Sequence, residues 1–446
     1  MHQIVGTRRG FLRRAGVFGS ACLAAACGRA RAAGQPVRVR KGIDEFARDP
    51  KALAALRAAV RKMRGLEPDH PFSWVFQANI HWRPFFPDYV YRQADESPDP
   101  AARLFRDKTG FTPPSEEQDV FNQCTHGNWW FLPWHRAYLY YFERALQWAA
   151  GDPALTLPYW NYSDPRHREL PPVFREPTVK GAAGDEPNPL YLPDGITFMN
   201  RQGKPEVFPL RDASLNGGLT QLTESATDVA AALKKPSFTT SPPAPGREGF
   251  GSPRACGLAC GCGSGALEAT PHNKVHNAIG GNAVAVGGGL RVGFMGDVAT
   301  AARDPVFWLH HGNIDRLWES WLAAGGPHAN PADADWLDRK FTFYDYDAGH
   351  PQGEPFQVRP SPRDLLSTEA LGYRYDRLER PPEPVAARAV FLPAAQPPQA
   401  LAETEAPKRA AGIPRGGRTP CPPGPSRRVS GSGPPRRPRS RCRWRR

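Results

Sequence analysis

The stretch of sequence that decides the fold is residues 304–318, which read DPVFWLHHGNIDRLW. Its Phe, Leu and Trp side chains indicate a segment that is buried in a core. It contains two adjacent histidines, His310 and His311, and Asp315 follows four residues later. Adjacent residues of a helix diverge by about a third of a turn, so we expect only one of the two histidines to face any given site.

Two further segments combine histidines with aromatic residues. Residues 124–136 read CTHGNWWFLPWHR and contain His126 and His135. Residues 272–276 read HNKVH, a spacing that places two imidazoles on one face of a helix with their β-carbons about 5–6 Å apart. The Glu of the zinc-protease helix motif is missing, because position 273 is Asn. Each segment alone is equally compatible with surface histidines or with core histidines that have ordinary partners.

Together the three segments indicate a metal site. Buried imidazoles need polar partners, and several in one core are difficult to satisfy except by a metal ion. All-imidazole ligand sets suit copper, zinc, iron or nickel. Three histidines and a water fit a catalytic zinc, whereas six histidines require two metal ions. The residues alone therefore leave the identity of the metal open.

The same segments resemble the two copper-binding signatures of the tyrosinase, catechol oxidase and haemocyanin group of binuclear type-3 copper proteins. The first signature is His126, eight intervening residues, His135 and then RAYLYYFE at 136–143. The second is HNKVH at 272–276 followed by residues 304–318. The resemblance covers residues 36–378 and implies a mainly α fold. In that fold a four-helix bundle core holds a dicopper site, with long loops and little β structure.

The resemblance also assigns ligands to two copper ions. The upstream ligand of the first copper is His81, which fits the family pattern better than His70. Of the adjacent pair, the second member is the ligand. The implied ligands are therefore His81, His126 and His135 for one copper, and His272, His276 and His311 for the other. Asp315 and Asn313 are candidates to orient the imidazoles, although either could instead pair with Arg316.

The implied reaction is the oxidation of o-diphenols to o-quinones by dioxygen, with hydroxylation of monophenols. In related enzymes hydroxylation is linked to a water held by a Glu and an Asn, and Glu268 and Asn273 match those positions. Val298, 13 residues before His311, stands at the site entrance, where a bulky Phe covers the site in some plant catechol oxidases. These residues favour a tyrosinase over a strict catechol oxidase. The alternative is that Glu268 begins a helix and Asn273 lies on the surface.

Cysteine usage adds one implied modification. Fungal members of the family join a cysteine at the position of Cys124 to an imidazole carbon, which implies a thioether to His126. A free buried thiol is the alternative. Cys256, Cys260 and Cys262 lie in a Gly-rich segment and allow one internal disulfide at most. A role of this segment in copper loading is the other interpretation.

Other functions stay open on the sequence. An o-aminophenol oxidase has the same fold, and comparing aminophenol with tyrosine as substrates distinguishes it. A haemocyanin-like oxygen carrier shares the site, and turnover of a catechol excludes it. The expected partners are a phenolic small molecule and dioxygen, without nucleic acid. The sequence does not decide the physiological phenol, the oligomeric state, or whether a partner protein loads the copper.

The basic charge of the chain is concentrated at its two ends. The 446 residues carry a formal charge of +14. Residues 1–32 contain six Arg, residues 407–446 contain 13 Lys or Arg, and neither segment contains an acidic residue. Without these 19 cations, residues 33–406 carry −5. This balance argues against a nucleic-acid partner for the body of the chain and leaves a binding role of the basic tail as a separate hypothesis.

The chain is expected to have three parts. In residues 1–32, Arg8-Arg9, a short apolar stretch and an A-x-A site resemble a twin-arginine signal, which implies a periplasmic or secreted protein. Residues 33–378 are expected to form the dicopper domain, and residues 379–446 a Pro/Arg-rich disordered tail. No apolar run is long enough for a transmembrane helix.

Periodicity predicts only part of the secondary structure. Apolar residues at helical spacing predict helices at 52–64 and 137–150. Residues 165–255 are rich in Pro, Gly, Ser and Thr and are expected to form long loops. Short Val-containing pieces between glycines at 280–293 predict one small hairpin.

Overall fold

The computed structural model describes residues 36–107, 120–121, 123–181, 184–240, 248–254, 263–349 and 353–380. These residues belong to one compact unit. The predicted export signal, the three cysteines at 256–262 and all but the first two residues of the predicted tail lie outside the described residues. Within the described residues, no helix has the length and apolar content needed to cross a membrane.

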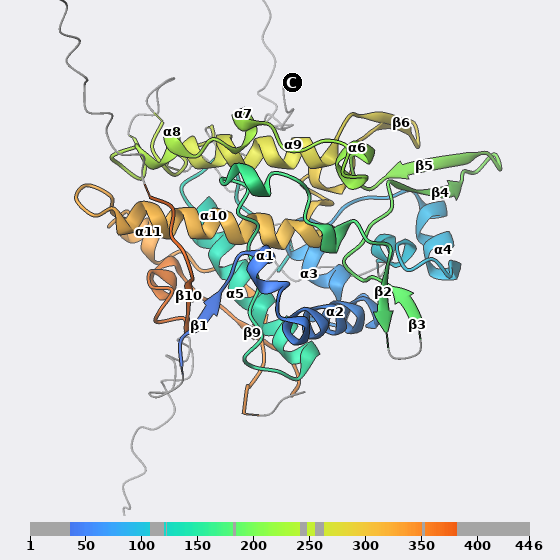
Figure 1. Ribbon diagram of the computed structural model, residues 1–446, viewed down its shortest axis with the longest axis horizontal. Coiled ribbons are helices and arrows are strands. Elements are labelled where there is room, and N and C mark those ends of the chain that lie inside the picture. The colour runs from blue at the N-terminus through green and yellow to red at the C-terminus, as the bar shows by residue number, and fades with distance from the viewer. Residues whose placement is uncertain are drawn as a thin grey trace, which may run out of the picture. The chain divides into compact units, whose positions relative to one another are not determined.

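Helix α10 (Pro305–Ala323) runs through the middle of the molecule (Figure 1). The Asp304 side chain accepts a hydrogen bond from the backbone N–H of Val306 at 2.9 Å, and Pro305 occupies the first helical position. Both features favour the start of a helix at this point. Most of α10 is buried, so it forms the centre of the core rather than a helix with one solvent face.

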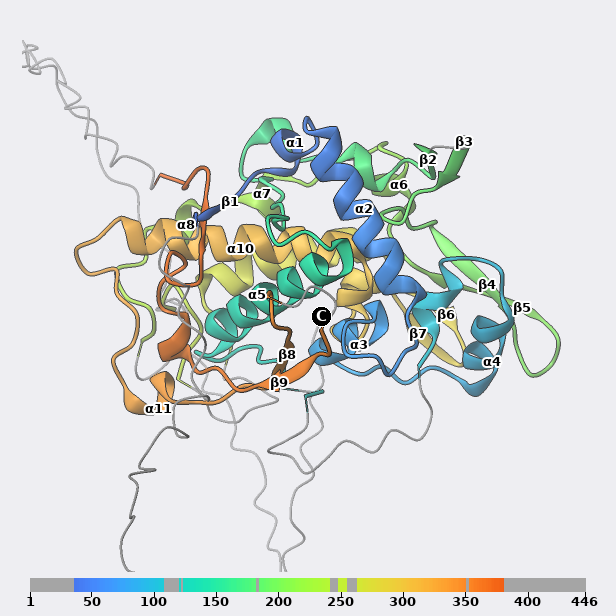
Figure 2. The same cartoon turned by 90° about the horizontal axis from the view of Figure 1, so that it is seen from below.

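Helix α5 (Phe131–Ala150) packs against α10 and against α2 (Pro50–Gly65), as Figure 2 shows. The two predicted helices are thus confirmed. Helix α5 begins earlier than the apolar pattern indicates, because its first turn is buried on all sides and has no amphipathic period. It ends at Gly151, whose φ of 67° is the left-handed conformation that terminates many helices.

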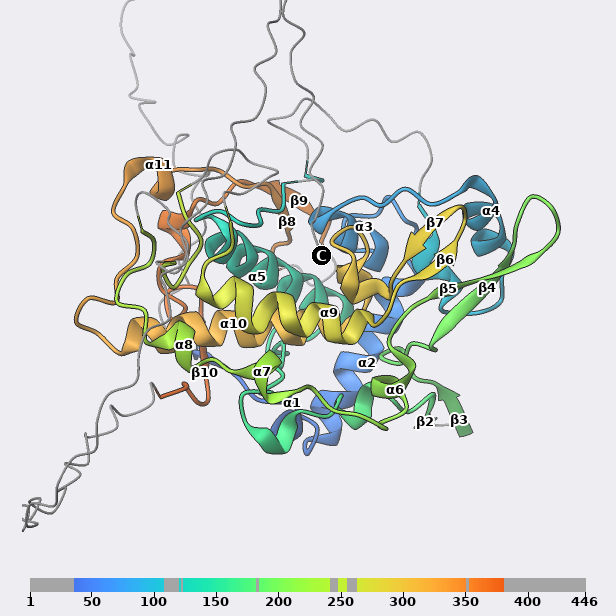
Figure 3. The ribbon, with the colours of Figure 1, turned by 90° about the horizontal axis from the view of Figure 1, so that it is seen from above.

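Two shorter helical segments complete the part of the core that carries the histidines. Ser73 caps α3 (Trp74–His81) by accepting a hydrogen bond from the N–H of Phe76 at 3.0 Å. A kinked segment, η4 (Glu268–Asn273), in which Thr270 has an extended backbone (φ −148°, ψ 122°), leads into α9 (Lys274–Gly280). Helix α9 lies alongside α10 in Figures 1 and 3. The mainly helical bundle that the resemblance implies is therefore present.

The remaining helical elements are short. The other α-helices are α1 (Ile43–Phe46), α4 (Asp88–Glu96), α6 (Ala213–Asn216), α7 (Glu224–Thr227), α8 (Ala230–Leu233) and α11 (Ala334–Leu337). The 3-10 turns are η1 (Ala102–Phe105), η2 (Pro165–His167), η3 (Pro172–Phe174), η5 (Phe294–Gly296), η6 (Ala301–Arg303) and η7 (Pro362–Leu365).

The strands of the described residues form two-stranded sheets only. Strands β1 (Arg38–Arg40) and β10 (Tyr373–Tyr375) pair in parallel, with Arg38 opposite Tyr373. The antiparallel hairpins are β2 (Thr178–Gly181) with β3 (Gly184–Pro187), β4 (Gly195–Met199) with β5 (Pro205–Pro209), β6 (Val284–Val286) with β7 (Gly289–Arg291), and β8 (Phe343–Asp345) with β9 (Phe356–Val358). The β6–β7 pair confirms the predicted hairpin.

The prediction of long loops across 165–255 is wrong in part. This stretch contains strands β2 to β5 and helices α6 to α8. In β4, buried and exposed residues alternate over only five positions. Such a short alternation, set among Pro and Gly, is too weak a signal to stand out in the sequence.

Candidate metal centre

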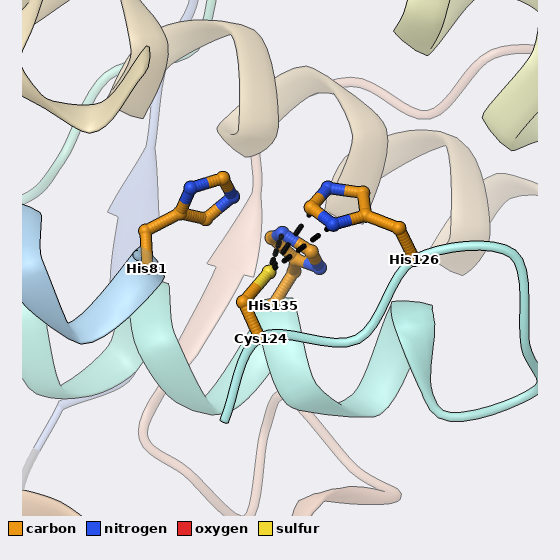
Figure 4. Close-up of side chains that lie close together, drawn as sticks. All are labelled: His81, Cys124, His126 and His135. Atoms are coloured by element: carbon orange, nitrogen blue, oxygen red, sulfur yellow. Dashed lines mark hydrogen bonds between the residues drawn. The ribbon is translucent and has the colours of Figure 1, made fainter. Parts of the chain in front are cut away.

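Three of the predicted ligands gather around one point. His81 is the last residue of α3, His135 lies in α5, and His126 lies in the loop before α5. Their rings point toward one another in Figure 4, with Cys124 beside them. One potential ligand atom from each of these four residues lies within 4.8 Å of the others. His126 therefore reaches the centre from a loop rather than from a helix of the bundle.

A second group consists of His272 in η4, His276 in α9, and both His310 and His311 in α10. Their ligand atoms also lie within 4.8 Å of one another. The prediction that only one of the adjacent pair faces the site is wrong, because both rings reach this group. The His310 ring also lies close to Tyr162, whose hydroxyl is 2.9 Å from Nδ1 of His310.

The two groups form one centre. The rings of His135 and His311 are stacked, with centroids 4.4 Å apart and planes 9° apart. The rings of His126 and His272 are 5.8 Å apart. The first group is thus in direct contact with the second, and α5 and α10 are the helices that bring them together.

Fixed hydrogen bonds orient most of the rings. Nδ1 of His81 lies 2.8 Å from the carbonyl oxygen of Val298, Nδ1 of His135 lies 2.7 Å from that of Phe131, and Nδ1 of His276 lies 2.8 Å from that of Met295. Since a carbonyl oxygen can only accept, Nδ1 carries the proton in each ring and Nε2 keeps its lone pair.

His272 is oriented by its neighbour in the same way, because its Nδ1 lies 2.8 Å from Oδ1 of Asn273. The predicted orienting roles of Asp315 and Asn313 are wrong. Oδ1 of Asn313 accepts from Nε of Arg316 at 2.9 Å. Asp315 accepts from Nε of Arg136 at 2.6 Å, from Tyr373 at 2.8 Å and from Tyr375 at 2.6 Å. Asn313 thus pairs with Arg316 within α10, which is the alternative that the sequence left open, whereas Asp315 joins α10 to other elements.

All seven imidazoles are neutral near pH 7. Burial lowers the pKa of His126 to about 3 and that of His276 to about 4. Burial also lowers the pKa of the other five well below the ordinary value. A neutral imidazole is the form that binds a metal.

Several buried nitrogens of the centre fit metal ions. Among the described residues, Nε2 of His81, Nε2 of His272, Nε2 of His310 and Nδ1 of His311 have no hydrogen-bond partner. Nε2 of His276 lies 3.2 Å from Nε2 of His311. Two nitrogens bound to one ion at about 2.0–2.1 Å are about 3 Å apart, so this pair has the separation of two ligands on a shared metal.

Glu268 and Asn273 lie at the edge of the centre. The Glu268 side chain is buried, at 1% exposure. Its Oε1 accepts from the backbone N–H of Gly127 at 2.7 Å, and its Oε2 accepts from the Ser252 hydroxyl. Burial raises the pKa of Glu268 to about 7, although both hydrogen bonds act to lower it. Glu268 is the first residue of η4, as the alternative held, but its side chain is buried rather than solvent-exposed. Asn273 is partly buried, so it is not the surface residue of that alternative.

Cys124 is the one free cysteine within the described part of the chain, and it is buried. Its Sγ lies 3.5 Å from Nδ1 and 4.0 Å from Nε2 of His126, and 3.7 Å from Nε2 of His135 (Figure 4). The sulfur therefore faces the edge of the His126 ring that contains the carbon between the two nitrogens. Burial raises the pKa of the Cys124 thiol well above its ordinary value.

Comparison with known protein families decides what this centre is. Residues 71–324 match the model for the common central domain of tyrosinase. The chain belongs to the tyrosinase family. Residues 330–384 match the polyphenol oxidase middle domain. The cofactor of the tyrosinase centre is a pair of copper ions, and the two histidine groups are placed to hold them.

Individual relatives come from bacteria and plants. The chain is 32% identical to tyrosinase HcTyr1 of a Hahella species, over 76% of this chain and 63% of the relative. It is also 32% identical to a chloroplastic polyphenol oxidase of Malus domestica, over 72% of this chain and 46% of the relative. Latent apple tyrosinase superposes with a TM-score of 0.52 at 27% identity, over 77% of this chain and 64% of that chain. This member of the tyrosinase family thus spans about half to two thirds of the length of these relatives.

Proposed function

We propose that this tyrosinase-family chain is a dicopper phenol oxidase that oxidises o-diphenols to o-quinones with dioxygen and also hydroxylates monophenols. The observation that carries the proposal is the meeting of two histidine groups whose buried ring nitrogens lack partners. When bound, the copper pair supplies the redox chemistry that lets dioxygen oxidise a phenol. The chain supplies the ligand geometry, a largely buried site and the groups that handle protons.

The proposed ligands are those of the two signatures. One copper is held by His81, His126 and His135, and the other by His272, His276 and His311. The choice of His311 over His310 rests on contacts. His311 stacks on His135 and faces His276 through Nε2, so it lies between the two groups. The His310 ring lies beside Tyr162 and does not take this place, and the family pattern likewise takes the second histidine of the pair.

Backbone carbonyls keep the centre ready to bind metal. The carbonyls of Val298, Phe131 and Met295 each hold one ring in the tautomer that leaves Nε2 free. Such outer contacts fix ring orientation and raise the basicity of the ligand. Little rearrangement is therefore needed when copper binds.

Hydroxylation of a monophenol requires a base, because the bound phenol must lose its proton. We assign to Glu268 and Asn273 the role of holding the water that accepts this proton. Glu268 supports the role because it is buried beside the loop of His126 and has a pKa raised to about 7. A carboxylate with such a pKa is matched to proton transfer near neutral pH.

Val298 leaves room for a monophenol at the site entrance. Its side chain is partly exposed, and its carbonyl fixes His81. Valine is much smaller than the Phe that covers the site in some plant catechol oxidases. The proposal of hydroxylase activity rests on this residue together with Glu268 and Asn273.

A thioether between Cys124 and His126 is part of the proposal. Its formation would join Sγ to a ring carbon and remove the thiol hydrogen and one ring C–H hydrogen, and dioxygen, the co-substrate of the proposed reaction, would take up the two electrons and two protons as hydrogen peroxide. The 3.5 Å and 4.0 Å distances from Sγ to the two ring nitrogens support it. The mass of the copper-loaded protein should be lower than the sequence mass by two hydrogen atoms, and Cys124→Ala should remove this difference. An unchanged mass would exclude the thioether.

The arginine pair at positions 8 and 9 supports export in the folded state, so we propose a periplasmic or secreted location. Replacing both arginines with lysine should leave the protein in the cytoplasm. Export that continues without the pair would remove this part of the proposal.

The direct test is oxygen uptake by the purified, copper-loaded protein with tyrosine and with a catechol. We expect uptake with both substrates, and Asn273→Ala should lower monophenol turnover more than diphenol turnover. Uptake with the catechol alone would identify a strict catechol oxidase. Equal losses on both substrates in Asn273→Ala would contradict the role of Asn273.

A further inference from the structure

The carboxylate of Glu268 is held by a serine that no copper signature contains. Ser252 is 1% exposed, and its hydroxyl donates to Oε2 of Glu268. The same Oγ accepts from the backbone N–H of Gly265 at 2.9 Å. Because a hydroxyl has a single proton, this arrangement directs that proton at Glu268. With Gly127 donating to the other oxygen, the carboxylate has one rotamer that satisfies both donors.

The backbone fixes the place of Ser252. Residues 249–252 lie beside residues 264–267, where the N–H of Ala266 donates to the carbonyl of Gly249 at 2.9 Å and that of Leu267 donates to Phe250 at 3.1 Å. A β-carbon on Gly265 would lie 2.2 Å from the backbone of Gly251, so this close approach requires glycine. The two segments are thus clamped without the serine hydroxyl.

Asn273 is held by Ser264, a residue of the same pair of segments. Its Nδ2 donates to Oγ of Ser264 at 3.2 Å, while its Oδ1 accepts from Nδ1 of His272. The amide of Asn273 is thus held at both ends, with its nitrogen at Ser264 and its oxygen at His272. Ser252 and Ser264 thus lie on the two paired segments. The Ser252 hydroxyl contacts Glu268, and the Ser264 hydroxyl contacts Asn273.

We propose that Ser252 and Ser264 are positioning residues that hold Glu268 and Asn273, and that they set the ratio of monophenol hydroxylation to diphenol oxidation. This inference rests on the proposed function of Glu268 and Asn273. The two hydroxyls are not needed to hold residues 249–252 beside residues 264–267, because backbone hydrogen bonds already do so. What they add is a fixed orientation of two polar side chains beside His126 and His272.

The test compares Ser252→Ala and Ser264→Ala in the full, copper-loaded chain. A hydrogen bond to a charged group contributes enough that kcat/KM for tyrosine should fall roughly tenfold in Ser252→Ala. For an o-diphenol, kcat/KM should stay within about twofold, since its oxidation makes less use of the base. Ser264→Ala should change the ratio in the same direction. Unchanged ratios in both variants would overturn the inference.

Ser320→Ala is the matched control. Ser320 is also 1% exposed, accepts a backbone N–H from Glu379 at 2.9 Å and donates to the carbonyl of Arg316 at 2.7 Å. It holds a chain segment in the same manner but contacts no group of the centre. Its loss should leave the ratio of the two activities unchanged. A ratio that falls as far as in Ser252→Ala would mean that any buried serine has this effect, which would overturn the inference.

A double-mutant cycle separates this inference from the proposed function. Ser252→Ala should have no further effect on the ratio in a Glu268→Gln background, because the serine acts through Glu268. If Glu268→Gln and Asn273→Ala leave the ratio unchanged, the proposed function fails. If these two variants lower the ratio, this inference fails in either of two cases. Ser252→Ala alone leaves the ratio unchanged, or it lowers the ratio further in the Glu268→Gln background. If Ser252→Ala does not retain two copper ions, the same double-mutant cycle is measured with Ser264→Ala and Asn273→Ala, because Ser264 is only partly buried.

Discussion

At the scale of residues, His310 and His311 test the ligand assignment most sharply, because they are adjacent and both rings reach the second group. His311→Ala should reduce the copper content from two ions per chain to one. His310→Ala should retain two ions, because the family pattern takes the second histidine of the pair and it is the His311 ring that stacks on His135. Metal analysis of the two purified variants decides the matter, and loss of one copper in His310→Ala alone would reverse the assignment.

Glu268 gives a prediction on pH in the copper-free protein. Its pKa is raised to about 7 in the folded state, so folding favours the protonated acid. The stabilisation is complete below the unfolded value near 4.5 and is lost as pH rises to about 7. Relative to Glu268→Gln, the wild-type free energy of unfolding should therefore fall by about 3 kcal/mol across that window and then level off. Denaturant titrations at several pH values measure this difference, and parallel curves for the two proteins would contradict it.

Side-chain chemistry was predictable from the sequence, whereas backbone contacts were not. The ligand histidines stand in long, specific patterns. The carbonyls of Val298, Phe131 and Met295 that orient the rings leave no such pattern, because every residue has a carbonyl. Ser252 was missed for a related reason. Its partner is 16 positions away, and the spacing of the two matches no regular element.

At the scale of elements, Asp315 joins α10 to α5 and to the β1–β10 pair. It is 3% exposed and accepts from Arg136, Tyr373 and Tyr375. Removing its charge leaves the buried Arg136 with the Glu319 carboxylate at 2.6 Å but without its buried partner, so the loss should approach the lower end of the roughly 3–5 kcal/mol of a broken buried pair. Asp315→Asn should therefore lower the free energy of unfolding by about that amount.

The matched control for Asp315→Asn is Asp185→Asn. Asp185 pairs with Lys180 at 2.7 Å, but both side chains are largely exposed. Exposed pairs contribute about 0–1 kcal/mol, so this change should have little effect on stability. Equal effects of the two substitutions would show that the Asp315 network does not hold the elements together.

The length of an element decided how well it was predicted. Helices α2 and α5 have apolar residues at helical spacing over several turns, so their existence was predictable. The four- and five-residue strands between 178 and 209 were not. The β1–β10 pair joins residues more than 330 positions apart, and its register depends on the arginine and tyrosine contacts that the fold brings together.

At the scale of the whole molecule, the fold and the metal were predictable and the fine specificity was not. The two signatures predicted a helical dicopper domain, and the helical bundle and the two histidine groups confirm it. We propose that hydroxylation of a monophenol depends on how Glu268, Asn273 and their serine partners are oriented. That orientation is set by tertiary contacts among segments that the sequence pattern did not connect.

The most direct measurement is the copper content of the purified full chain together with oxygen uptake on a catechol, before and after removal of the metal by a chelator. We predict two copper ions per chain and oxygen uptake that disappears with the metal and returns when copper is restored. A single metal ion per chain, or oxygen uptake that persists without copper, would contradict the assignment of a dicopper phenol oxidase.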